Sequence, residues 1–198
     1  MRKDRLLAFS DGVFAIIITI MVLELKTPHT PDLAELLKLS PVLASYVLSF
    51  VYVAIYWNNH HHMLEPVRRI NGATLWANMF LLFWLSLVPF ATAWMGETHF
   101  ATLPTAIYGV VLLMPAIGYT ILQRVLIAAH IDNALLARAV GRDFKGKLSL
   151  VLYAAGIGLA FVRPWAAVTA YALVALMWLL PDPRIERAVA DRESRTAD

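Results

Sequence analysis

Long apolar runs separated by short polar segments dominate this chain of 198 residues. A helix needs about 20 residues to cross the hydrocarbon core of a bilayer, and six runs reach or approach that length. They lie at residues 6–25, 41–63, 74–95, 103–129, 148–162 and 165–180. The last two are short and are joined through Arg163 and Pro164, which predicts a tight helical hairpin.

The pattern predicts an all-α integral membrane protein with six transmembrane helices per subunit. We expect one transmembrane domain over residues 1–183 and a polar cytoplasmic tail over residues 184–198. Composition agrees, because 60% of the residues are hydrophobic and the mean hydropathy is +0.64, values too high for an ordinary soluble domain. The chain has no Cys, which excludes a disulfide framework and thiolate metal sites.

The basic residues predict the orientation of the chain, since Lys and Arg are retained on the cytoplasmic side of a membrane. With the N-terminus inside, only Lys26, Lys38 and Arg163 of the 17 Lys and Arg residues fall in outer segments. An even number of spans and this bias agree with each other. Both predict a multi-pass protein of the cell membrane with two cytoplasmic termini.

The first predicted helix has two chemically different sides. At about 100° per residue, its largely aliphatic side carries Phe9, Gly12, Ile16, Thr19, Ile20 and Leu23. Asp11 projects to the opposite side. An aliphatic stripe in a membrane helix is most often lipid-facing or part of the bundle core, so the stripe alone does not indicate a function.

Ser10 and Asp11 have two interpretations. They are typical of a helix N-cap at the membrane edge, where a side-chain oxygen accepts from free backbone N–H groups. However, the apolar residues before them favour a helix that has already begun by about Leu6. Asp11 then lies more than one turn inside the helix, where an unpaired carboxylate is costly and usually functional.

Polar partners for these residues are available near the cytoplasmic end of the second run. Trp57 lies three and four positions before His60 and His61, so their side chains can share a helix face. We predict a hydrogen-bonded cluster of Arg5, Ser10 and Asp11 with Trp57 and either His60 or His61.

The three consecutive His residues could also suggest a metal site or a membrane enzyme. Adjacent helical positions point about 100° apart, so His60, His61 and His62 do not converge on one ion. Only His61 and Glu65 have the i, i+4 spacing of a ligand pair. A structural polar cluster is therefore favoured, and we expect no metal, no cofactor and no enzymatic activity.

The segment "RLLAFSDGVFAI", followed by "TIMVLEL" and by "YWNNHH" in the next run, resembles the signature of prokaryotic members of the endosomal and lysosomal potassium channel family. This resemblance implies a homotetramer of six-span subunits in the lipid bilayer. Four copies of the first helix would line a central pore, with no separate filter loop. Monovalent cations, potassium above all, would be its partners, and nucleic acid would not.

Carried onto this sequence, the resemblance implies that Ile16 forms a hydrophobic gate and that Ile20 and Leu23 line the pore farther outward. Thr19 matches a hydroxyl layer that bears on selectivity. The motif residues Arg5, Phe9, Ser10 and Asp11 would form a structural network that holds the pore helix against Trp57 and a His side chain, His60 or His61. A proton-coupled transporter that uses Asp11 and a second-span His is the alternative, although the weak internal symmetry of the chain disfavours it.

Overall fold

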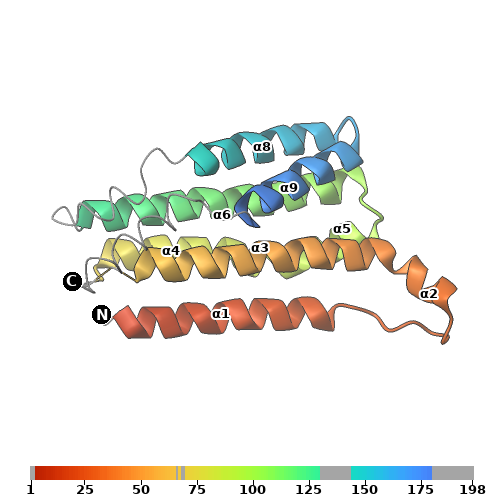
Figure 1. Ribbon diagram of the computed structural model, residues 1–198, viewed down its shortest axis with the longest axis horizontal. Coiled ribbons are helices and arrows are strands. Elements are labelled where there is room, and N and C mark those ends of the chain that lie inside the picture. The colour runs from red at the N-terminus through yellow and green to blue at the C-terminus, as the bar shows by residue number, and fades with distance from the viewer. Residues whose placement is uncertain (1–2, 66, 68–69, 130–143, 180–198) are drawn as a thin grey trace, which may run out of the picture.

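The computed structural model (Figure 1) describes residues 3–65, 67, 70–129 and 144–179, and these residues form helices and connecting loops only. The predicted all-α fold is confirmed for this part of the chain. The predicted tail at residues 184–198 lies outside the described residues. The helices are α1 (Lys3–Leu23), α2 (Leu33–Lys38), α3 (Ser40–Leu64), α4 (Gly72–Ser86), α5 (Val88–Glu97), α6 (Thr102–Ala129), α8 (Phe144–Ala160) and α9 (Pro164–Leu179).

Four helical stretches among the described residues are long and apolar enough to cross a membrane: α1, α3, α4 with α5, and α6. The helices α8 and α9 have 17 and 16 residues. At 1.5 Å per residue each reaches about 25 Å, which is short of the roughly 30 Å of hydrocarbon in a typical bilayer. The count of six spans therefore stays a prediction.

The third stretch differs from the uninterrupted helix predicted at residues 74–95. It consists of α4 and α5, which meet at Leu87. Pro89 is the physical reason, because it has no backbone N–H to donate and its ring crowds the carbonyl of Leu85 four residues earlier. The two helices still form one stretch of 26 residues.

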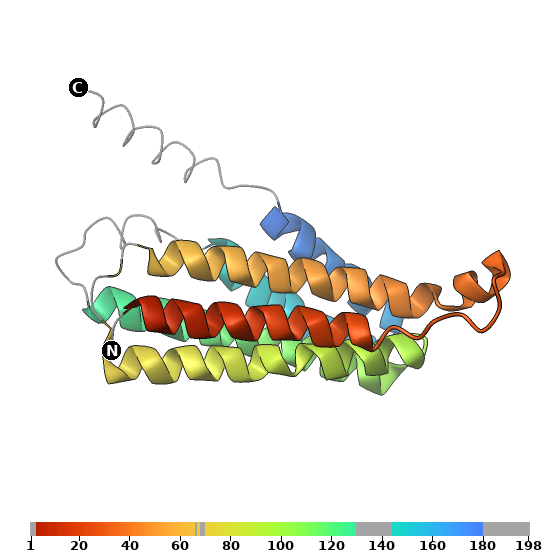
Figure 2. The ribbon, with the colours of Figure 1, turned by 90° about the horizontal axis from the view of Figure 1, so that it is seen from below.

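Successive long helices run in opposite directions, and α1 lies along one side of the bundle (Figure 1). Seen from below in Figure 2, α1 lies between α3 and the α4–α5 stretch. In Figure 1, α8 lies at the edge of the bundle opposite α1. Among the described residues, one side of α1 is therefore left without a neighbouring helix.

The far side of the bundle is held by tight packing and by buried hydroxyl groups. Gly109 and Gly156 both lie against the ring of Tyr171, which occupies the space that a Cβ atom would need. Thr92 Oγ1 donates to Ser49 Oγ at 2.6 Å, and the two hydroxyls of Ser49 and Tyr108 are 2.9 Å apart. These contacts join α3, α5, α6, α8 and α9 into one core.

Candidate functional site: α1 and the polar contacts that hold it

The buried and exposed sides of α1 divide its residues as the helical projection predicts. The side chains that face the bundle are Leu6, Ser10, Phe14, Ile17 and Met21. On the exposed side, Ile16, Ile20 and Leu23 keep 59%, 42% and 76% of their surface accessible in the single chain. The structure thus brings the three aliphatic candidates together on one uncovered face. Only the role of that face stays a prediction.

Thr19 belongs to the same exposed face. Its Oγ1 donates a hydrogen bond to the carbonyl oxygen of Ala15 at 2.8 Å, which uses the single hydroxyl proton. The lone pairs of the oxygen are then left for an outside group. This geometry suits contact with a cation, which needs oxygen acceptors and not a donor.

The polar motif lies inside α1 and not at its start. The helix begins at Lys3, so Ser10 and Asp11 are about two turns from its first residue, and the N-cap interpretation does not apply. Ser10 is fully buried, and its Oγ donates to the carbonyl oxygen of Leu6 at 2.9 Å. A hydroxyl that bonds to its own helix in this way still has acceptor capacity for another partner.

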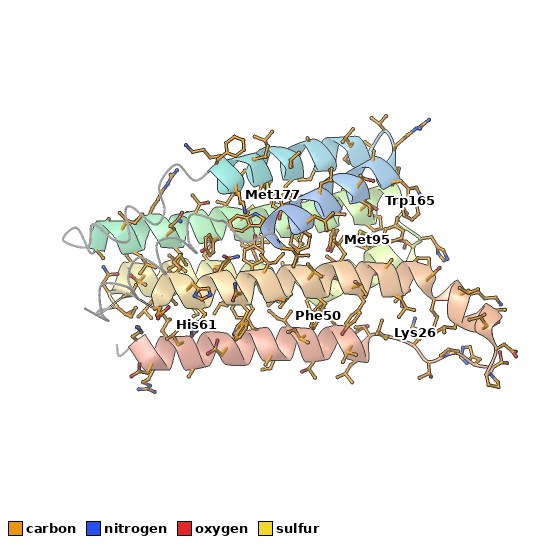
Figure 3. All side chains as sticks on the ribbon, viewed as in Figure 1. Lys26, Phe50, His61, Met95, Trp165 and Met177 are labelled. Atoms are coloured by element: carbon orange, nitrogen blue, oxygen red, sulfur yellow. The ribbon has the colours of Figure 1, made fainter. Side chains whose placement is uncertain are left out.

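Asp11 and Trp57 meet across the boundary between α1 and α3. Trp57 Nε1 donates to Asp11 Oδ1 at 3.0 Å, and the Trp57 ring lies 6.4 Å from the exposed ring of His61. Figure 3 shows His61 and Lys26 near opposite ends of α1. The acidic motif residue is therefore paired with the second long helix in the N-terminal half of α1.

His60 lies in a separate buried cluster, together with a residue that sequence reasoning missed. Asn78 Nδ2 donates to Ser10 Oγ at 3.0 Å, and Asn78 Oδ1 is 2.7 Å from His60 Nε2. All three side chains are buried, and Phe14 lies against the His60 ring. The signal that could have revealed Asn78 is its position as an isolated amide within an apolar run.

Arg5 and Phe9, two residues of the predicted network, belong neither to this cluster nor to the Asp11–Trp57 contact. Arg5 is exposed, and within the described residues it makes no hydrogen bond or ion pair with Asp11. The reason is helical geometry, because six positions correspond to a turn of about 240°. Phe9 is also exposed and lies on the side of Ile16. Among the described residues, Arg5 therefore does not join the predicted hydrogen-bonded cluster.

Lys side chains hold the two ends of the α1 region. Lys3 Nζ donates to the backbone carbonyl of Glu65 at 2.6 Å, beside the C-terminal end of α3. Lys26, just after α1, bonds to Glu97 Oε1 at 2.5 Å, and this hydrogen bond raises the pKa of Lys26. Both contacts are at the surface, where ion pairs contribute little to stability.

The remaining candidate groups show no metal-site geometry. His62 Nδ1 lies 3.9 Å from Glu65 Oε2, and both side chains are exposed. Within the described ranges, no three His, Asp or Glu residues gather closely enough to hold a metal ion.

A pocket in another part of the bundle is lined by aromatic residues such as Tyr56, Tyr119 and Tyr153. None of the described residues in its wall belongs to α1.

Comparison with known proteins identifies relatives of this chain. A model of the family described as "Endosomal/lysosomal potassium channel TMEM175" matches residues 5–89. A potassium channel of Chryseobacterium sp. (strain P1-3) is 52% identical over 191 residues, which covers 96% of this chain and 100% of that protein. The human endosomal/lysosomal proton channel TMEM175 is 31% identical over 101 residues, covering 45% of this chain and 20% of that protein.

A solved structure has the same fold. It is the crystal structure of a lysosomal potassium-selective channel TMEM175 homolog from Chamaesiphon minutus, which superimposes with a TM-score of 0.77 at 29% identity. The match covers 89% of this chain and 96% of that one. The α-helical bundle described above is thus a multi-pass membrane protein and not an enzyme, and the chain belongs to the TMEM175 family of potassium channels.

Proposed function

We propose that this chain is a potassium-permeable, potassium-preferring cation channel of the cell membrane, with both termini cytoplasmic. Four six-span subunits surround one pore, and α1 of each subunit lines it. The observation that carries this proposal is the division of α1 into a buried side with Ser10 and Phe14 and an exposed aliphatic side with Ile16 and Ile20. The relatives named as potassium channels support the choice of ion.

The narrowest point of this pore is a ring of Ile16 side chains, with Ile20 one turn and Leu23 two turns farther outward. A narrow aliphatic ring expels water, and this closes the path to hydrated ions. A wider ring admits ions that deform their hydration shell easily, and potassium is more weakly hydrated than sodium. A modest preference for potassium follows without carbonyl coordination, and the chain has no segment like the "TVGYG" filter loop.

Thr19 adds oxygen atoms to this apolar path. Because its hydroxyl proton is bound by Ala15, the oxygen presents lone pairs toward the exposed side of α1. A ring of such oxygens replaces part of the hydration of a passing cation. Glu24, exposed directly after α1, biases the outer mouth toward cations.

The test is the reversal potential for potassium against sodium of purified protein in liposomes at fixed pH, for the unmodified protein and for Ile16→Asn. The unmodified protein should prefer potassium. Ile16→Asn should increase the leak and weaken the preference, because an amide wets the ring. Val151→Asn is the matched control, since Val151 is an exposed aliphatic residue of α8, at the edge of the bundle opposite α1. Both flux and preference should stay unchanged in that variant.

Thr19→Val separates selectivity from gating. It keeps the shape of the side chain and removes the hydroxyl, so the preference for potassium should fall while the closed state stays tight. If the preference does not change, the aliphatic rings alone select the ion.

Two other outcomes contradict the proposal. Unchanged flux in an assembled Ile16→Asn channel would remove Ile16 from the pore. Flux that saturates and requires a proton gradient would indicate a transporter built on Asp11 and a second-span His.

A further inference from the structure

A single amide side chain connects three helices in the buried part of the bundle. Asn78 belongs to α4, is fully buried, and bonds to Ser10 of α1 and to His60 of α3. Buried hydrogen bonds in an apolar region depend strongly on geometry, since a misplaced partner leaves both groups without water or a substitute. Asn78 is therefore well placed to control the orientation of α1.

The direction of each bond in this cluster follows from the proton inventory. Ser10 has one hydroxyl proton and donates it to the carbonyl of Leu6, so toward Asn78 it acts as an acceptor. The amide nitrogen of Asn78 must then face Ser10, and its oxygen must face His60. His60 Nε2 therefore carries the proton that it donates to Asn78 Oδ1. Each of these groups has one arrangement that satisfies the others.

The other contacts of α1 define its rotation less sharply. Phe14, Ile17 and Met21 make apolar contacts, which are non-directional and tolerate a turn of the helix about its axis. The Asp11–Trp57 bond joins side chains that are partly accessible, so it is less sensitive to geometry than a buried bond. Among the described residues, the Ser10–Asn78 hydrogen bond is thus the one fully buried polar contact between α1 and another helix.

The rotation of α1 decides which residues leave the bundle. Ser10 lies about 120° around the helix from Ile16, so Ile16 points away from the bundle when Ser10 points at Asn78. A rotation of about 60° to 100° would bring Ile17 and then Met21 toward the exposed side, and it would carry Leu23 away from the centre of that side.

We propose that Asn78 is a positioning residue for ion conduction. It holds α1 at the rotation that presents Ile16, Thr19 and Ile20 to the pore. This inference rests on the proposed function, because it concerns the same pore helix.

Cysteine accessibility provides a direct test, because the chain contains no Cys of its own. Single substitutions Ile20→Cys, Leu23→Cys, Ile17→Cys and Met21→Cys are made in the unmodified background and in Asn78→Leu. The rate of modification by a water-soluble methanethiosulfonate reagent is measured on the assembled protein in liposomes, together with the reversal potential.

In the unmodified background, cysteines at positions 20 and 23 should react quickly and those at 17 and 21 slowly. One buried hydrogen bond biases an equilibrium by about fivefold. In Asn78→Leu, the rates at positions 17 and 21 should therefore rise by about fivefold, and the preference for potassium should fall. A purely structural role would lower the yield of assembled protein without exchanging the reactive positions.

A second variant and a matched control keep the test decisive. Ser10→Ala removes the α1 partner of the same bond with a small change in volume, and it should produce the same exchange of reactive positions if Asn78→Leu does not assemble. Asn59→Leu is the control, because Asn59 Nδ2 bonds to the carbonyl of Ile55 within its own helix. It should leave the pattern on α1 unchanged.

The possible failures are distinguishable. If cysteines at positions 20 and 23 are no more reactive than those at 17 and 21 in the unmodified background, α1 does not line a water-filled path. That result overturns the proposed function and this inference with it. If the unmodified pattern is as expected but stays the same in Asn78→Leu and Ser10→Ala, the proposed function survives and the positioning role of Asn78 is overturned.

Discussion

The two helices α1 and α6 are both long and apolar, yet they relate to the rest of the chain in opposite ways. α1 leaves five large apolar side chains exposed and α6 leaves two, although α6 is the longer by seven residues (28 against 21). Their glycines differ as well. Gly12 of α1 has open space where a Cβ atom would be, whereas Gly109 of α6 lies against the side chains of Tyr171 and Ile157.

This difference shows which described helix is packed on most sides by other helices of the chain. The packing of α6 against α4, α8 and α9 is formed within the chain. For α1, one side is held by α3, α4 and α5, and the other side has no neighbouring helix in the part of the chain that the structure describes. A membrane helix with an unpartnered aliphatic face and a buried polar anchor suits a position at the axis of an assembly.

The largest effect on stability is expected where the packing is tightest. Gly109→Ala places a methyl group against the buried ring of Tyr171, and overpacking of this kind costs about 1–3 kcal/mol. The free energy of unfolding in detergent should fall accordingly. Gly158→Ala is the matched control, because its Cβ position is open, and it should be neutral or slightly stabilising. Equal stability of the two variants would contradict the tight packing described for α6.

A smaller effect is expected at the hydrogen bond between Asp11 of α1 and Trp57 of α3. Asp11→Ala removes the acceptor of the Trp57 indole N–H, and a hydrogen bond to a charged group contributes about 1.5–3 kcal/mol when buried. Because Asp11 is only partly buried, the lower end of that range is expected. The fraction of assembled protein in size-exclusion chromatography should fall, while the potassium preference of the remaining channels stays the same.

Asp11→Asn is the control for this hydrogen bond, because the amide oxygen still accepts from Trp57. This variant should assemble better than Asp11→Ala. Intact assemblies of Asp11→Ala with altered selectivity would instead place Asp11 on the conduction path.

The smallest effect is expected at Gly12. Alanine is a better helix former than glycine by up to about 1 kcal/mol, and none of the described residues lies within 4 Å of the added methyl group. Gly12→Ala should therefore leave the free energy of unfolding unchanged or raise it slightly. A clear loss of assembled protein would indicate that Gly12 lies in close contact with a second copy of the chain. Gly12 would then be packed between chains, whereas Gly109 of α6 is packed within one chain.

Much of the fold follows from local pattern. The apolar runs place the helices to within a few residues of their observed bounds, as with Lys3–Leu23 for the run at 6–25. Helical periodicity likewise puts Ile16, Ile20 and Leu23 on one side of α1. The interruption at Leu87 has a local cause in Pro89, but the hydropathy of that stretch is unbroken, so the apolar pattern predicts a single helix.

The hydrogen-bonding partners of the polar side chains, in contrast, depend on contacts between distant parts of the chain. Trp57 is 46 residues from Asp11 and could be proposed because both are near the same end of antiparallel helices. Asn78 is 68 residues from Ser10, and the tertiary structure was needed to show it beside both Ser10 and His60. The structure also leaves Arg5 exposed and divides the neighbouring His60 and His61 between a buried cluster and the surface.

The sequence by itself thus determined which segments are apolar helices and which residues share a face of α1, because both properties depend on composition and on the 100° helical repeat. The tertiary structure alone decided which polar side chains pair, and which face of α1 stays uncovered. Those outcomes depend on the approach and rotation of whole helices, and a rotation of a few tens of degrees exchanges one buried partner for another.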